Sequence, residues 1–183
     1  AGARPGDVLA TADRGNSRHV AFVEHAAALL RGAAYTTFDG TQPEQRTHAG
    51  IGAAYAHVTA PLRRLVDRYG SEICLAAKAG TAVPQWVFER LLSLPATMAD
   101  ADRRAHEVDR AVIDATEAWL LRDRVGERFT ATVIDADAHA ATVVVDEPAI
   151  RARCTGDNLP VGEQITVTLA EADPTTRMVR FQV

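Results

Sequence analysis

Two adjacent arginines, Arg63 and Arg64, follow Thr59 and Pro61 where an extended segment leads into a predicted helix. The first N–H groups of a helix have no partner within it and the helix dipole is positive there, so such a start favours a bound anion. Arginine adds a rigid, charged fork that matches phosphate oxygens. The segment therefore predicts a phosphate-binding site, and the alternative is a capped surface helix whose arginines are solvated.

A longer pattern surrounds these arginines. The run from His48 to Arg68 reads H-A-G-I-G-A-A-Y-A-H-V-T-A-P-L-R-R-L-V-D-R. It resembles the signature of the RNB exoribonucleases, the ribonuclease II and ribonuclease R family, which reads roughly H-F-G-L, a short spacer, then Y-A-H-F-T-S-P-I-R-R-Y-x-D. The matches are His48, Gly50, Tyr55, Ala56, His57, Thr59, Pro61, Arg63, Arg64 and Asp67, with Ile51 and Leu62 as close substitutes. The departures, at Ala49, Val58, Ala60 and Leu65, indicate a divergent branch.

The resemblance implies a 3′→5′ exoribonuclease that hydrolyses single-stranded RNA to nucleoside monophosphates. In the family, Mg²⁺ is held by an aspartate cluster that precedes the matched segment. We therefore expect this chain to be a C-terminal fragment that is inactive alone, binds no metal itself, and has the missing N-terminal part of the catalytic domain and single-stranded RNA as partners. The chain starts at Ala1 without a methionine, which fits a fragment of a longer protein, although processing of the N-terminus would give the same start.

The acidic residues and histidines of the chain do not predict a metal site. Asp100 and Asp102 fall in an acidic helix start, while Asp135 and Asp137 fall in a predicted turn, and structural roles are favoured over metal binding for both pairs. Neither pair has the further carboxylates that a two-metal site needs. The histidines show no HxxxH or HExxH spacing.

The resemblance implies a role for each residue of the motif. Arg63 is expected to contact the phosphate that is cleaved and to be catalytic, although an i,i+4 pair with Asp67 would compete for its side chain. Arg64 points about 100° away round the predicted helix and shares a face with Arg68. The two side chains are expected to bind RNA at the next phosphate, or else Arg64 is solvated.

Tyr55, His57 and Thr59 complete the predicted RNA-binding set. Tyr55 and His57 are expected on alternate faces of an extended segment, so that at most one of them faces the RNA. Either ring could stack on a base or fix the loop.

Charge and composition limit how the chain can hold RNA. The formal net charge is −4, and the part from residue 126 onward holds five arginines and nine acidic residues, so phosphate binding must come from local arrangement. The hydrophobic content of 47% suffices for a core. No apolar run is long enough to span a bilayer, no membrane partner is expected, and a cytoplasmic location is the default.

Helical periodicity dominates the first two thirds of the chain. It predicts helices over residues 17–31, from 60 or 61 to 78, over 84–92 and over 96–122. Residues 35–38 are expected to form a short strand-like piece. Small apolar residues along the long fourth helix are expected to pack against a neighbouring helix rather than to self-associate.

From Gly126 onward, apolar residues alternate with polar ones, around 129–133, 142–146, 165–169 and 179–183. Period two and turns at Asp157-Asn158 and Asp173-Pro174 predict a small antiparallel barrel of the OB type. Its only aromatic residues, Phe129 and Phe181, are on the inward alternation, so we expect a weak RNA binder or a structural lid.

The sequence thus predicts an α+β chain with two parts. Residues 1–125 are expected to form the mainly helical C-terminal portion of an RNB-type catalytic domain, and residues 126–183 an OB-like β-barrel. The alternative function is a non-enzymatic helical plus OB module that binds RNA or a protein partner.

Overall fold

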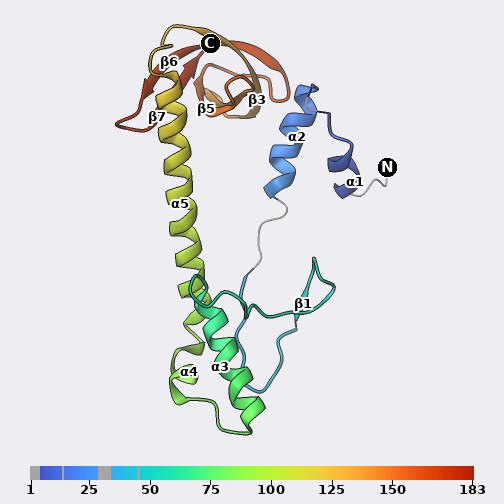
Figure 1. The fold of residues 1–183 in the computed structure, drawn as a ribbon. Helices are drawn as coiled ribbons and strands as arrows, with labels where there is room; N and C mark the ends of the chain where they lie inside the picture. Colours follow the sequence, from blue (N-terminus) through green and yellow to red (C-terminus); the bar gives the residue numbers. More distant parts are fainter. Residues whose placement is uncertain (1–4, 14, 29–33, 45) are drawn as a thin grey trace. The chain divides into compact units, whose positions relative to one another are not determined.

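The computed structural model describes residues 5–13, 15–28, 34–44 and 46–183 (Figure 1). The chain divides into two compact units. The helical unit consists of the described residues within 33–107, and the barrel unit combines those within 1–32 with residues 108–183. The predicted domain boundary between residues 125 and 126 stays a prediction.

The helical unit contains a short hairpin followed by three helices. Its elements are β1 (Thr47–His48), β2 (Ala53–Ala54), α3 (Leu65–Ala79), α4 (Gln85–Leu91) and the first half of α5 (Leu94–Leu121). Tyr69, Val87, Leu94 and Met98 form its buried core. This core fixes α3, so the residues just before α3 are held on a packed support.

Helix boundaries follow the sequence signals with one important difference. Gly80 ends α3 in the left-handed conformation, with φ of 65°, close to the predicted end at residue 78, and its N–H bonds to the carbonyls of Ala76 and Ala77. α2 (Ser17–Ala28) begins where predicted, and the predicted end at residue 31 lies outside the described residues. The start of α3 at Leu65, rather than at residue 60 or 61, is the difference that matters for the site.

The long helix α5 is confirmed, but the predicted packing of its small apolar stripe is wrong. Met98 is buried, whereas Val108, Val112 and Trp119 are 63%, 61% and 56% exposed. Among the described residues, therefore, no neighbouring helix covers the second half of this stripe.

The terminal barrel is closed, with strand order β3-β4-β5-β7-β6. Its strands are β3 (Arg128–Ala136), β4 (Ala140–Val145), β5 (Ile150–Thr155), β6 (Gln164–Asp173) and β7 (Met178–Gln182). All neighbouring pairs are antiparallel except β5 and β7, which are parallel. Phe129 and Phe181 meet edge to face inside it, 5.6 Å between ring centroids, as the inward alternation predicted. The OB-like fold is confirmed.

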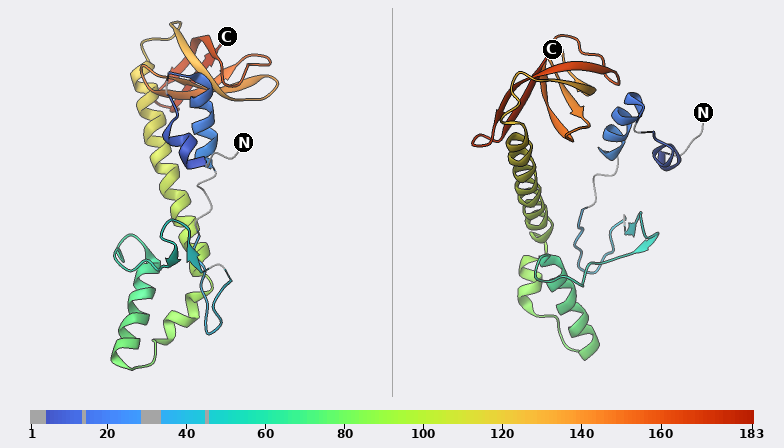
Figure 2. Two further views of the ribbon diagram at one scale, coloured as in Figure 1. Left: turned by 90° about the vertical axis from the view of Figure 1, so that its right-hand side faces the viewer. Right: turned by 45° about the horizontal axis from the view of Figure 1, so that its top comes forward.

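An N-terminal helix packs on this barrel (Figure 2). α2 lies against β3, following α1 (Pro5–Ala10). His25 Nε2 is 2.7 Å from the Ile134 carbonyl oxygen, and Ser17 Oγ donates to the Gly162 carbonyl at 2.7 Å. Glu24 pairs with Arg151 at 3.2 Å. These contacts explain why residues so distant in sequence share a compact unit.

Two predictions on secondary structure need correction. Residues 34–38 form no strand, because their chain is unpaired and borders a cavity instead. β5 was not predicted, although its burial alternates along the strand. Its inward residues Ala152 and Cys154 are small, and they alternate with Arg151 and Arg153 on the outer face. The sequence of this strand therefore shows little apolar periodicity. No described helix is long and apolar enough to cross a membrane.

Candidate functional site

The candidate site is built on the turn that precedes α3. The N–H groups of Arg63 and Arg64 both donate to the Ala60 carbonyl, at 3.2 and 3.0 Å, which closes a tight turn. Arg64 then takes an extended conformation, φ −128° and ψ 109°, as the N-cap residue. Both arginines therefore lie before the helix, and the prediction that they occupy its first turn is wrong.

The Asp67 side chain connects this turn to the helix by an ion pair with Arg64. We call this ion pair the Arg64–Asp67 lock. Arg64 Nε donates to Asp67 Oδ1 at 3.0 Å and Nη2 donates to Oδ2 at 2.8 Å, a two-pronged bridge. Oδ2 also accepts the Ala60 N–H at 2.6 Å. The Asp67 side chain has no exposed surface and that of Arg64 only 16%. The lock thus holds both ends of the turn.

The predicted competition between Arg63 and Asp67 is therefore wrong, because Arg64 takes the carboxylate. The expectation that Arg64 is solvated fails for the same reason. Arg64, three residues before Asp67, forms the pair in place of Arg63, four residues before it. The reason is that the backbone of Arg64 is extended, so its side chain reaches over the first turn of α3.

The titration behaviour of the lock follows from its contacts. Burial acts to raise the pKa of the Asp67 carboxyl, but hydrogen bonds from Arg64 and the Ala60 N–H, with the charge of Arg64, hold that pKa below its usual value. The hydrogen bond to Asp67 in turn raises the pKa of the Arg64 guanidinium. Both groups are charged at neutral pH, so the lock is an ion pair.

Arg63 has a different environment from Arg64. Its side chain is exposed, and among the described residues it makes no side-chain hydrogen bond or ion pair. The rigid turn therefore presents a guanidinium with all its donors open to a ligand.

Arg68 and Thr59 have structural contacts. The Arg68 guanidinium lies over the Trp86 ring, 5.8 Å from its centroid, although its side chain is exposed. Thr59 Oγ1 accepts a long hydrogen bond of 3.4 Å from Arg64 Nη2. Thr59 therefore supports the lock, and Arg68 does not share the environment of Arg64.

The structure brings Tyr55 and His57 together. Their rings meet edge to face with centroids 5.1 Å apart, and both line one cavity of about 650 Å³. The prediction that they lie on alternate faces is wrong, because side chains two residues apart in an extended segment point to the same side.

Sequence reasoning missed two members of this aromatic group. Tyr35 packs edge to face on His57 at 5.7 Å, and His48 on Tyr55 at 5.5 Å. His48 belongs to the quoted motif and was available as a signal. Tyr35 lies in the segment predicted as a short strand, and local sequence offers nothing that marks it as part of the site.

One residue of each acidic pair makes a structural contact. Asp100 pairs with Arg103 at 2.9 Å, and Asp137 accepts the N–H groups of His139 and Ala140 in the β3–β4 turn. In the part of the chain that the structure describes, no three His, Cys, Asp or Glu side chains gather in a group that could hold a metal ion.

Comparisons with known proteins bear on this arrangement. Residues 127–183 match the family model for the RNase II-type exonuclease C-terminal S1 domain. A comparison with curated protein sequences finds no match.

Solved structures share the fold. The apo form of Mycoplasma genitalium RNase R has a TM-score of 0.72 at 15% identity, covering 91% of this chain and 29% of that chain. The same enzyme in complex with ribose methylated single-stranded RNA has a TM-score of 0.72 at 16% identity, with the same coverage. The Candida glabrata Dss1 exoribonuclease, an active site mutant, has a TM-score of 0.67 at 14% identity and covers 91% of this chain and 21% of that chain.

The chain spans less than a third of the length of these structures. The resemblance to the RNB exoribonucleases that the motif indicates is confirmed. The terminal barrel is similar to the C-terminal S1 domain of RNase II-type exonucleases, and the chain has the fold of the matching part of RNase R.

Proposed function

We propose that this chain is the C-terminal part of a 3′→5′ exoribonuclease that hydrolyses single-stranded RNA to nucleoside monophosphates. The observation that carries the proposal is the open guanidinium of Arg63, presented by the rigid turn that the Arg64–Asp67 lock holds. The S1-type terminal domain supports it, and so does the RNase R neighbour solved with single-stranded RNA.

In this proposal Arg63 contacts the phosphate that is cleaved. Negative charge grows on the equatorial oxygens of that phosphate during hydrolysis, and a fixed guanidinium stabilises it without reorganising. Arg64 and Thr59 act mainly by holding the turn, and their exposed atoms contact the backbone of the bound RNA. Exposed Arg68 contacts a further phosphate, and Tyr55 and His57 contact bases.

The residues of this chain do not fit a magnesium site. Asp67, the buried carboxylate nearest Arg63 in the sequence, is fully engaged by Arg64 and the Ala60 N–H, and the described residues hold no other suitable group. We therefore expect the Mg²⁺ that the family chemistry requires to be held by the missing N-terminal part of the catalytic domain.

The direct test compares the chain with a longer protein that also carries the aspartate-bearing segment. With 5′-labelled single-stranded RNA and Mg²⁺, we expect stepwise 3′ shortening by the longer protein and none by the 183-residue chain alone, because phosphodiester hydrolysis by this route needs the metal ligands. RNA cleavage by the chain alone that persists after repurification would contradict the proposal that the metal ligands lie in the preceding segment. Failure of the longer protein to cleave would favour a non-enzymatic RNA- or protein-binding module.

A second expectation concerns the affinity of this chain for RNA. The barrel has no exposed aromatic residue, and the whole chain carries a net charge of −4. We expect the 183-residue chain to bind a single-stranded RNA oligonucleotide with a dissociation constant no lower than about micromolar at physiological salt, as in non-specific contacts. Fluorescence anisotropy across a salt series checks this, and nanomolar binding would show that the barrel has an RNA surface of its own.

A further inference from the structure

A second buried carboxylate lies outside the candidate site. Asp67 and Glu117 are the charged residues that are buried in the described part of the chain. Asp67 belongs to the lock, whereas Glu117 lies on the second half of α5, in the barrel unit. Burial raises the pKa of the Glu117 carboxyl, because a site withdrawn from water disfavours the charged form. A carboxylate held at such a cost is expected to have a structural partner.

The partner of Glu117 is the main chain of Arg151, at the start of β5. Glu117 Oε1 accepts the Arg151 N–H at 3.1 Å. Arg110, also on α5, donates from Nη2 to the Arg151 carbonyl oxygen at 3.3 Å. Arg110 Nη2 lies 2.7 Å from the Asp114 carboxylate and 3.7 Å from that of Glu117, so the two carboxylates orient its guanidinium. Two side chains of α5 thus bind both main-chain polar groups of one β5 residue, and we call this arrangement the Arg151 clasp.

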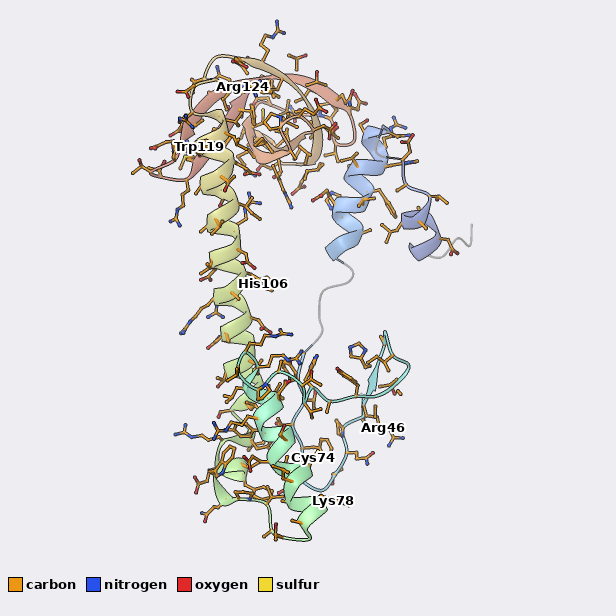
Figure 3. All side chains as sticks on the ribbon, viewed as in Figure 1. Arg46, Cys74, Lys78, His106, Trp119 and Arg124 are labelled. Atoms are coloured by element: carbon orange, nitrogen blue, oxygen red, sulfur yellow. The ribbon has the colours of Figure 1, made fainter. Side chains whose placement is uncertain are left out.

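The clasp fills a gap in the hydrogen-bond ladder of the barrel. β5 pairs with β4 along its whole length, Ile150–Thr155, but its register with β7 begins at Arg153. Arg151 lies before this register, so in the described strands β7 does not reach its main chain. Main-chain groups withdrawn from water need partners, and folds cover strand edges that lack a neighbouring strand. α5, which reaches the barrel near Trp119 (Figure 3), supplies these partners with side chains.

A weaker contact joins Arg151 to α2. Arg151 Nη1 lies 3.2 Å from Glu24 Oε2, but both side chains are partly exposed, and exposed ion pairs contribute little to stability. α2 has other contacts with the barrel, to the carbonyls of Ile134 and Gly162. Glu117, by contrast, is only 8% exposed. The stabilising effect of the clasp is therefore expected to come mainly from Glu117.

We propose that α5 completes the terminal barrel, with Glu117 and Arg110 as the hydrogen-bond partners that β7 does not give to the start of β5. The S1-type barrel of this chain is then not an independent module, because its closure depends on a helix that precedes it in the sequence. A barrel of this size buries little apolar surface by itself, so one buried anchor matters for its stability. The inference goes beyond the proposed function, since it holds whether or not the longer protein cleaves RNA.

The test measures amide hydrogen exchange of the 183-residue chain, followed residue by residue in NMR spectra. Glu117→Ala leaves the Arg151 N–H without its acceptor, so we expect the amides of β4, β5 and β7 to exchange about tenfold faster or more. Glu117→Gln keeps a side-chain oxygen that can accept the same N–H, and it should retain most of the protection. Arg110→Ala should have a smaller effect, because its hydrogen bond is longer and its side chain is exposed.

Two further variants separate the clasp from general effects. Asp109→Ala removes an exposed carboxylate of α5 and should leave exchange in the barrel unchanged. Arg153→Ala removes the next outward arginine of β5, which pairs with Asp137 rather than with a helix, and should likewise leave exchange slow. The amides of α3 report on the helical unit, and their exchange should stay the same in every variant.

The proposal is overturned if barrel amides exchange in Glu117→Ala as slowly as in Asp109→Ala, because the barrel would then close without α5. It is also overturned if Glu117→Gln loses protection as fully as Glu117→Ala, because acceptance of the Arg151 N–H would not be the cause. If Glu117→Ala does not fold, Glu117→Gln and Arg110→Ala decide. Slow exchange in the first with faster exchange in the second supports the clasp, and an Arg110→Ala barrel that exchanges like Asp109→Ala overturns it.

Discussion

Replacing Arg64 with alanine is expected to lower the melting temperature of the helical unit by roughly 10 °C, since removing one partner of a buried ion pair strands the other. The Asp67 carboxylate has no exposed surface and would keep only the Ala60 N–H as a donor. Thermal unfolding followed by Trp86 fluorescence, in a Trp119→Phe background, reports on this unit alone, because Trp86 lies in it and Trp119 in the barrel unit.

Two comparisons isolate the lock from general effects. Arg90→Ala removes an exposed arginine of α4 and should change the melting temperature little. In a double-mutant cycle, Arg64→Ala with Asp67→Ala should be less destabilising than the sum of the single changes, because the stranded carboxylate is gone. If Arg64→Ala melts where Arg90→Ala does, the lock does not stabilise the turn.

The pH dependence of the lock has a defined sign. The folded-state pKa of Asp67 lies below its usual value of 3.8, so its stabilisation is fully present above that pH and is lost as the pH falls through the lower, folded-state value. The difference in melting temperature between the wild type and Arg64→Ala should therefore be constant near neutral pH and should shrink in acid. A difference that grew on acidification would contradict the ion pair.

The sequence predicted those parts of the fold that depend on local patterns. α3 ends close to the predicted residue 78, and the alternation around Phe129 and Phe181 marks barrel strands, because local periodicity decides each feature. β5 was not predicted from the sequence, because its two arginines and two small residues give little apolar periodicity.

The site could be predicted only in its residue list. The motif named Arg63, Arg64 and Asp67, but which arginine pairs with the carboxylate depends on the extended conformation of Arg64, which is a tertiary result. The same limit applies to Tyr35, because its contact with His57 joins segments 22 positions apart.

The exposed stripe on α5 shows a different limit. The spacing of Val108, Val112 and Trp119 correctly indicates one helix face, and yet the described residues leave this face uncovered. Periodicity reports that a face is apolar, but it does not say which polypeptide segment packs there.

In the proposed function, the open guanidinium of Arg63 stabilises the phosphate undergoing cleavage, while Arg64 holds the turn. In the longer protein, Arg63→Ala should slow cleavage by about 10²-fold or more, as for loss of a group that stabilises transition-state charge. RNA affinity should change far less, because other phosphate contacts along the strand remain. Arg63→Lys should recover little, since a point charge cannot replace the two-pronged fork.

The decisive measurement is the single-turnover rate of cleavage at saturating RNA for the wild type, Arg63→Ala and Arg63→Lys, with Arg90→Ala as the matched exposed arginine of the helical unit. The proposed role of Arg63 predicts that both Arg63 variants are slowed by about 10²-fold or more while Arg90→Ala cleaves at the wild-type rate. Cleavage by Arg63→Ala at the wild-type rate once RNA is saturating would show that Arg63 only assists binding, and the assignment of the site would be wrong.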